Sequence, residues 1–199
     1  MCKAREPEEM IAGIVLAAGK SERMGRPKAL LPIRGRTFLE NILDSISRSS
    51  IQQTIVVVGH DREEIQRNVT LPSVIFNADY ERGMITSFQA GIRALPRTFS
   101  GALLFLVDHP LVEPRTIESL IVNFAPDRII LPVFHGRRGH PVLFASEILQ
   151  EILTLPPSLG ANMVIRKDPG RIIEVSVDAP GILVDVDTPE QFEKLQSEL

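Results

Sequence analysis

The stretch Ile11-Ala-Gly-Ile-Val-Leu-Ala-Ala-Gly-Lys-Ser-Glu-Arg-Met-Gly-Arg-Pro-Lys28 joins an apolar run directly to a loop rich in glycine and positive charge. The basic residues of the loop are Lys20, Arg23, Arg26 and Lys28. Only Glu22 opposes them. Glycines let backbone N–H groups turn toward phosphate oxygens, and the cations supply counter-charge. The stretch therefore predicts a buried strand followed by a loop that binds a polyphosphate.

Two common phosphate-binding loops are excluded by spacing. Gly19-Lys20-Ser21 resembles the end of a Walker A motif, but that motif needs a glycine five residues earlier, where this chain has Ile14. Gly13 is the nearest glycine and lies inside the predicted strand. The Gly-x-Gly-x-x-Gly pattern of dinucleotide-binding folds does not occur in the loop either.

Length and composition favour one soluble domain. The chain has 199 residues, a formal net charge of −3, and no stretch that looks like a domain linker. The mildly acidic charge argues against a nucleic-acid partner. Cys2 is the single cysteine, which excludes an intrachain disulfide. Residues 1–10 are polar and predicted to be flexible, and the apolar run after them is too short for a signal peptide or membrane span, so we expect a cytoplasmic protein without a membrane partner.

Strand-like apolar runs alternate with amphipathic segments along the chain. The predicted strands are Ile11–Ala17, Thr54–Val58, Val74–Phe76, Ala102–Val107, Arg128–Val133, Pro141–Phe144, Ile172–Val177 and Ile182–Val186. Helix starts are predicted at Thr37 with Glu40, at Asp61 with Glu64, and at Thr188 with Pro189 and Gln191. The alternation predicts an α/β fold with a mostly parallel sheet and helices on both faces.

In such a sheet the ligand lies beyond the carboxyl ends of the strands. The loop after Ala17 is at this edge, and so is Asp108, which ends the apolar run that begins at Leu103. A carboxylate beside a polyphosphate suits a Mg²⁺ ion, and we favour this interpretation over the alternative, an Asp in a turn before Pro110. For His109, an exposed loop residue is at least as good an interpretation as a ligand.

A second pair of carboxylates, Asp185 and Asp187, precedes the last predicted helix. On a strand they would share a face. Equally, Asp187 and Thr188 would simply begin the helix, with Pro189 in its first turn. Spacing alone leaves these two alternatives even.

Three other polar segments fall where loops are expected. Ser87 would lie near the start of a helix, where it either contacts a ligand or bonds its own backbone. His135-Gly-Arg-Arg-Gly-His140 combines the glycines of a hairpin with positive charge, which suits a phosphate-bearing second substrate. The segment Ser158–Val164 starts a helix whose N-terminus would accept an anion, although a helix start without a ligand is the simpler interpretation.

Together these motifs resemble the MobA-like nucleotidyltransferases, and in particular their molybdenum cofactor cytidylyltransferase branch. The resemblance rests on Leu16-Ala-Ala-Gly-x-Ser-x-Arg-Met-Gly-x-x-Lys28 with Leu30-Leu-Pro-x-x-Gly35, Tyr80-Glu-x-Gly83-Met with Ser87, Asp108-x-Pro110, Arg138-Gly-His140-Pro-Val, the Gly160-Ala segment and Asp185-x-Asp187-Thr-Pro-Glu190. It spans nearly the whole chain. It implies a single-domain, Rossmann-like fold of the nucleotide-diphospho-sugar transferase type.

The resemblance also implies a reaction and roles for individual residues. CMP would move from CTP to a molybdopterin-type acceptor with release of pyrophosphate. The implied catalytic residues are Arg23, Lys28 and Asp108. The implied nucleotide-binding residues are Leu16, Ala17, Ala18, Gly19, Arg23, Lys28, Ser87 and Asp108. Mg²⁺ would bind at Asp108 and Asp187, and the acceptor at Arg138 and His140. In the family, Ala-Ala-Gly in place of Ala-Gly-Gly goes with cytosine over guanine.

The chain departs from the family pattern at one place. Relatives often carry Gly-Asp-x-Gly-Ala-Arg where this sequence has Pro157-Ser-Leu-Gly-Ala-Asn162, without the acid and the arginine. The resemblance implies that this segment would serve the acceptor side, so the nucleotide is better defined than the acceptor. Two alternatives are a sugar-phosphate nucleotidyltransferase and a chaperone that delivers cofactor to a molybdenum hydroxylase apoenzyme.

Overall fold

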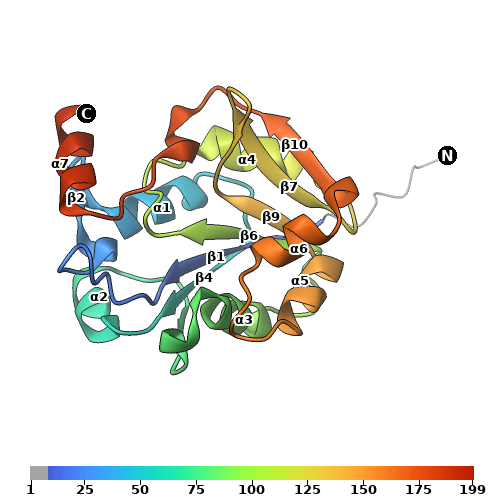
Figure 1. Ribbon diagram of the computed structural model, residues 1–199, viewed down its shortest axis with the longest axis horizontal. Coiled ribbons are helices and arrows are strands. Elements are labelled where there is room, and N and C mark those ends of the chain that lie inside the picture. Colours follow the sequence, from blue (N-terminus) through green and yellow to red (C-terminus); the bar gives the residue numbers. More distant parts are fainter. Residues whose placement is uncertain (1–8) are drawn as a thin grey trace.

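A computed structural model describes residues 9–199 (Figure 1). Its strands are β1 (Ile11–Ala17), β2 (Pro32–Ile33), β3 (Arg36–Thr37), β4 (Gln53–Val58), β5 (Val74–Phe76), β6 (Gly101–Leu106), β7 (Ile129–Phe134), β8 (Arg137–Arg138), β9 (Val142–Ala145) and β10 (Ile172–Ser176). Its α-helices are α1 (Phe38–Ser47), α2 (Arg62–Asn68), α3 (Met84–Ala94), α4 (Pro114–Val122), α5 (Ser146–Leu153), α6 (Asn162–Lys167) and α7 (Pro189–Ser197). Short 3₁₀ helices are η1 (Lys28–Leu30), η2 (Tyr80–Arg82), η3 (Pro169–Arg171) and η4 (Pro180–Leu183).

The main sheet has the strand order β10-β7-β9-β6-β1-β4-β5, with β8 paired to β7. Strand β1 lies between β4 and β6 and is parallel to both. Only β9 in the central path runs against its neighbours, pairing antiparallel with β6 and β7. The carboxyl ends of β1, β4, β5 and β6 therefore meet at one edge, which is where the loop after Ala17 and the residues after Leu106 emerge.

Helices cover both faces of this sheet, as the continuously apolar strands require. Alternate residues of β1 enter two different cores: Ile14 packs with Phe88 and Ile148 from α3 and α5, and Val15 packs with residues of α1, α2 and α4. Figure 1 shows α3 and α5 on one side of the sheet, and α1 and α4 on the other.

A third apolar cluster attaches the C-terminal helix to the rest of the chain. Phe192 of α7 packs against Phe38, with ring centroids 5.9 Å apart, and Met24 of the loop after β1 belongs to the same cluster. The two-stranded β2–β3 sheet supplies Ile33. Since Met24 is buried here, the apolar cluster also anchors the predicted phosphate loop.

Seven of the predicted strands are confirmed within one residue at each end, and the predicted helix starts are confirmed as well. Thr37 with Glu40, and Thr188 with Gln191, form complete capping boxes. Asp61 precedes α2, but its side chain makes no capping hydrogen bond.

The predicted strand Ile182–Val186 is wrong. Pro180 and Gly181 start the 3₁₀ helix η4 instead, and the residues after it run across the edge of the sheet without joining a ladder. A Cβ on Gly181 would lie 2.5 Å from the carbonyl oxygen of Leu111, so this close crossing requires glycine. A single backbone hydrogen bond, from Val186 N to the carbonyl oxygen of Asp108 (3.0 Å), fixes the segment against the end of β6.

The predicted flexible segment, residues 1–10, falls mostly on residues 1–8, which lie outside the described residues together with Cys2. In the part of the chain that the structure describes, no helix combines the length and the apolar character needed to cross a membrane.

Candidate active site

The loop after β1 is held in shape by its own hydrogen bonds. Ser21 has a positive φ of 51°, and its carbonyl oxygen accepts hydrogen bonds from Met24 N (2.9 Å) and Gly25 N (3.0 Å). The Ser21 hydroxyl accepts a hydrogen bond from Lys28 N (3.1 Å). Together with the buried Met24, these contacts bring Lys28 back to the end of the strand that the chain has just left.

The four basic side chains of this loop have different partners. Lys20 pairs with Glu81 of η2 (2.6 Å), which raises the pKa of Lys20 and lowers that of Glu81. Arg26 lies over the ring of Phe192, 5.2 Å from its centroid. The other two, Arg23 and Lys28, reach the two carboxylates singled out in the sequence.

Lys28 joins Asp108 and Asp187, which are far apart in the sequence. Its Nζ donates to Asp108 Oδ2 at 3.3 Å and forms a closer ion pair with Asp187 Oδ1. Arg23 pairs with the other oxygen of Asp187 at 2.6 Å. The hydrogen bond from Val186 N to the Asp108 carbonyl explains this meeting, because it aligns the segment before α7 with the end of β6.

The two acids before α7 have different environments. The hydrogen bond from Lys28 and its positive charge, supported by Arg23, hold the pKa of Asp187 below its usual value. Burial raises the pKa of Asp185, and repulsion from Asp108 and Asp187 adds to that effect. Asp187 is thus already paired with cations, whereas Asp185 would gain most from an added positive charge.

A set of donor atoms suited to a metal ion lies beside this pair. One ligand atom from each of Asp108, His109 and Asp185 falls within 4.8 Å of the others. Among residues 9–199, Asp108 Oδ1 and His109 Nδ1 are buried without a hydrogen-bond partner. Burial lowers the pKa of His109, which keeps the imidazole neutral and able to act as a ligand. Two carboxylates and an imidazole fit a divalent cation.

A cavity of about 410 Å³ opens in front of these groups. All the nucleotide-binding residues expected from the sequence line it: Leu16, Ala17, Ala18, Gly19, Arg23, Lys28, Ser87 and Asp108. Asp187 lines it too, as do Tyr80 and Met84. Gly59 forms part of its support, because a Cβ there would lie 2.4 Å from the carbonyl oxygen of Ala18.

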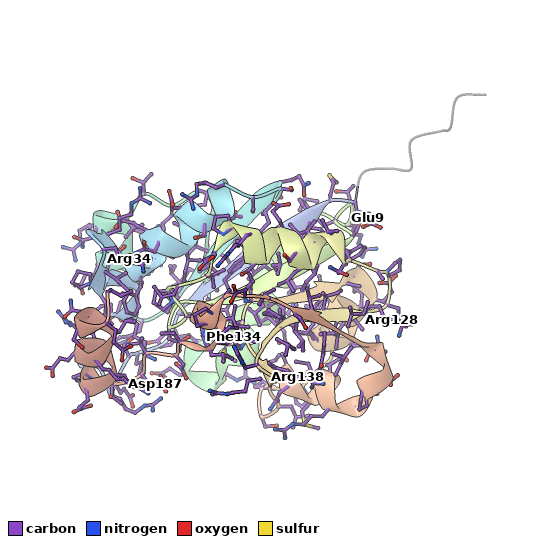
Figure 2. All side chains as sticks on the ribbon, turned by 90° about the horizontal axis from the view of Figure 1, so that it is seen from above. Glu9, Arg34, Arg128, Phe134, Arg138 and Asp187 are labelled. Carbon is purple, nitrogen blue, oxygen red and sulfur yellow. The ribbon has the colours of Figure 1, made fainter. Side chains whose placement is uncertain are left out.

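The two residues expected to bind the acceptor are placed differently. His140 packs on His109, with ring centroids 4.7 Å apart, and burial lowers the pKa of His140 to about 4. It therefore adjoins Asp108. Arg138, on β8, pairs with Glu174 of β10 at 2.7 Å. Figure 2 shows Arg138 well apart from Asp187. The charge of Arg138 therefore does not lie beside those of Arg23 and Lys28, which pair with Asp187.

Sequence reasoning missed several contributions to the site. Asp61 and Ile65 of the α2 region line the cavity; the sequence marks Asp61 only as a helix start, and no local pattern places either residue at a ligand site. Asn77 is buried behind Ser87 and donates a hydrogen bond to it. Its position directly after a strand was the one available signal.

The α/β sheet, with a cationic loop at its carboxyl edge facing Asp108 and Asp187, has the fold of a nucleotidyltransferase. A family model described as the MobA-like NTP transferase domain matches residues 13–172. The chain belongs to this family and is a nucleotidyltransferase of the MobA-like type.

The named relatives carry the names of different activities. The chain is 31% identical to "Nicotine blue oxidoreductase" of Paenarthrobacter nicotinovorans, covering 93% of this chain and 96% of the relative. It is 30% identical to "Molybdenum cofactor cytidylyltransferase" of Escherichia coli K12, covering 90% and 92%.

A solved structure is also similar over the whole fold. Rv0371c of Mycobacterium tuberculosis H37Rv superimposes with a TM-score of 0.87 at 30% identity, covering 96% of this chain and 100% of that one. Its complex with manganese gives a TM-score of 0.81 at 29% identity, with the same coverage. Metal binding thus occurs in a homologue of this fold.

Proposed function

We propose that this protein transfers CMP from CTP to a molybdopterin-type acceptor, with release of pyrophosphate and with Mg²⁺ as the cofactor. The observation that carries nucleotidyl transfer is the junction of Lys28 with Asp108 and Asp187 at the wall of one cavity. Counter-charges for a triphosphate and carboxylates for a cation are thereby adjacent, which transfer at an α-phosphate requires.

In this reaction an oxygen of the acceptor's terminal phosphate forms a bond to the α-phosphorus of CTP. The bond between that phosphorus and the bridging oxygen breaks, and pyrophosphate leaves with the electron pair. Arg23 and Lys28 stabilise the negative charge that develops on the departing group. No covalent nucleophile is needed, because positioning and charge neutralisation supply the catalysis.

A divalent cation at Asp108 would neutralise charge on the α-phosphate. The family resemblance assigns Asp187 as the second ligand, whereas the observed group contains Asp185 and His109. We expect Asp185→Asn to weaken Mn²⁺ binding about tenfold or more, and Asp187→Asn to weaken it less, because Asp187 is already paired with Arg23 and Lys28. Titration by Mn²⁺ electron paramagnetic resonance measures both. If Asp187→Asn weakened Mn²⁺ binding and Asp185→Asn did not, the second metal ligand would be Asp187.

The choice of CTP rests on the Ala17-Ala18 pair beside the cavity and on the cytidylyltransferase of E. coli among the relatives. The choice of acceptor rests on that same relative and on the His109–His140 pair. The two neutral imidazole rings lie next to the metal-binding group and are tilted by 50° to each other, and a heterocycle such as a pterin would pack against His140, the less buried of the two.

A thermal-unfolding screen of CTP, GTP, UTP and ATP with Mg²⁺ tests the nucleotide. CTP is expected to stabilise most, because a ligand at 100 times its Kd adds about 2.7 kcal/mol to the free energy of unfolding. Pyrophosphate release is then measured with molybdopterin and with sugar phosphates as acceptors. Turnover with a sugar phosphate alone would replace the proposed acceptor, and binding of a hydroxylase subunit without any transfer would favour the chaperone.

A further inference from the structure

A buried amide stands behind the nucleotide cavity. Asn77 follows β5 and is 6% exposed, and its backbone N–H donates to the carbonyl oxygen of Val58 at 2.9 Å. Its side-chain Nδ2 donates to the hydroxyls of Thr86 and Ser87, each at 2.9 Å. Both residues lie in the first turn of α3, and of the two only Ser87 is among the residues that line the cavity.

The orientation of this amide follows from its third hydrogen bond. Asp79 N, which can only donate, lies 3.0 Å from Asn77 Oδ1. The oxygen of the amide must therefore face Asp79, and its NH₂ group must face the two hydroxyls. Ser87 Oγ thus accepts from Asn77.

Accepting from Asn77 leaves the Ser87 proton free for another partner. The Thr86 hydroxyl donates back to the carbonyl oxygens of Asp79 and Gly83, both at 2.9 Å. Within residues 9–199, Ser87 Oγ donates no such hydrogen bond, although a serine in a helix often donates to a carbonyl of the preceding turn. The hydroxyl oxygen is therefore held by Asn77, and its proton is left available in a residue that lines the cavity.

We propose that Asn77 is a positioning residue that makes Ser87 an obligate hydrogen-bond donor toward the nucleobase. The site then requires a hydrogen-bond acceptor on the base at this point, and cytosine offers O2 and N3 along one edge. This inference rests on the proposed CTP site and adds to it the residue that sets the direction of the Ser87 hydroxyl.

Asn77→Asp tests the inference with almost no change in shape. A carboxylate accepts from Asp79 N, as the amide oxygen does, but it also draws the Ser87 proton away from the cavity. We expect Asn77→Asp and Ser87→Ala each to weaken CTP binding about tenfold, the scale of one hydrogen bond. Calorimetric titration with inorganic tripolyphosphate, which has no base, measures the effect of the added charge. In Asn77→Asp, the loss of affinity for CTP is expected to exceed the loss of affinity for tripolyphosphate by about tenfold.

The double variant and a neighbouring variant separate positioning from general damage. The double variant carries both Asn77→Asp and Ser87→Ala. After the effect of the added charge, measured with tripolyphosphate, is subtracted, the double variant should bind CTP no more weakly than Ser87→Ala alone. Thr86→Val removes a hydroxyl from the same network without touching Ser87, and CTP binding should stay within twofold of wild type. If Asn77→Asp does not fold, the neutral Asn77→Leu replaces it with the same expectation.

Equal CTP and tripolyphosphate losses in Asn77→Asp, or additive losses in the double variant, would overturn the role of Asn77 and leave the CTP site intact. Wild-type protein that binds tripolyphosphate but not CTP would overturn the proposed nucleotide as well as this role. The two failures are thereby distinguished.

Discussion

Replacing Asp108 by asparagine is expected to lower the rate of nucleotidyl transfer about a thousandfold, the scale of removing a group that stabilises charge in the transition state. Asp108 follows the end of β6 by two residues and lines the cavity, and its Oδ1 is buried without a partner among the described residues. Asparagine keeps the shape but removes the negative charge that would hold a cation. The measurement is kcat for pyrophosphate release.

The fold should survive this substitution, because Asp108 is partly exposed and asparagine still accepts from Lys28. A matched control is Asp127→Asn, which removes a carboxylate paired with Arg171 outside the cavity. Asp127 has a positive φ of 58°, a conformation that asparagine tolerates. Its kcat should stay near that of wild type. Turnover of Asp108→Asn within tenfold of wild type would contradict the role of Asp108.

Replacing Lys28 by methionine is expected to lower kcat/KM by a factor on the order of 100 to 1000. Among residues 9–199, Lys28 is the one cation that contacts both Asp108 and Asp187, and its side chain is largely buried. Methionine retains the apolar stem but leaves the departing pyrophosphate without this counter-charge. Steady-state kinetics with varied CTP measure the effect.

Lys20→Met is the internal comparison for Lys28→Met. Lys20 belongs to the same loop, but its charge is balanced by Glu81, and the pair is exposed to solvent. We expect Lys20→Met to change kcat/KM less than tenfold, since exposed ion pairs contribute little. Equal effects of the two substitutions would show that the loop acts through total charge rather than through the position of Lys28.

Most of the sheet follows from the sequence because several of its strands are nearly continuously apolar, as strands covered on both faces are. Seven of the predicted strands are confirmed. Ile182–Val186 has the same composition but crosses the sheet edge, because Pro180-Gly181 starts a 3₁₀ turn against Leu111. Apolar residues there fill the cluster beneath α7 instead of a ladder position.

The candidate site was predictable to the extent that topology brings strand ends together. The loop after Ala17 and the residues that include Asp108 follow two neighbouring parallel strands, so their meeting is a consequence of the strand order. The pairing of Lys20 with Glu81, and of Arg26 with Phe192, depends on where other loops pass, which local sequence does not specify. The same holds for Asn77, whose role depends on three partners in space.

The most direct test of nucleotidyl transfer is a single-turnover reaction with CTP labelled at the α-phosphate, Mg²⁺ and molybdopterin. We expect the label to move to the acceptor in step with pyrophosphate release, and Asp108→Asn to show neither. Folded wild-type protein that binds CTP but leaves the label in CTP with every acceptor tried would contradict the proposed reaction.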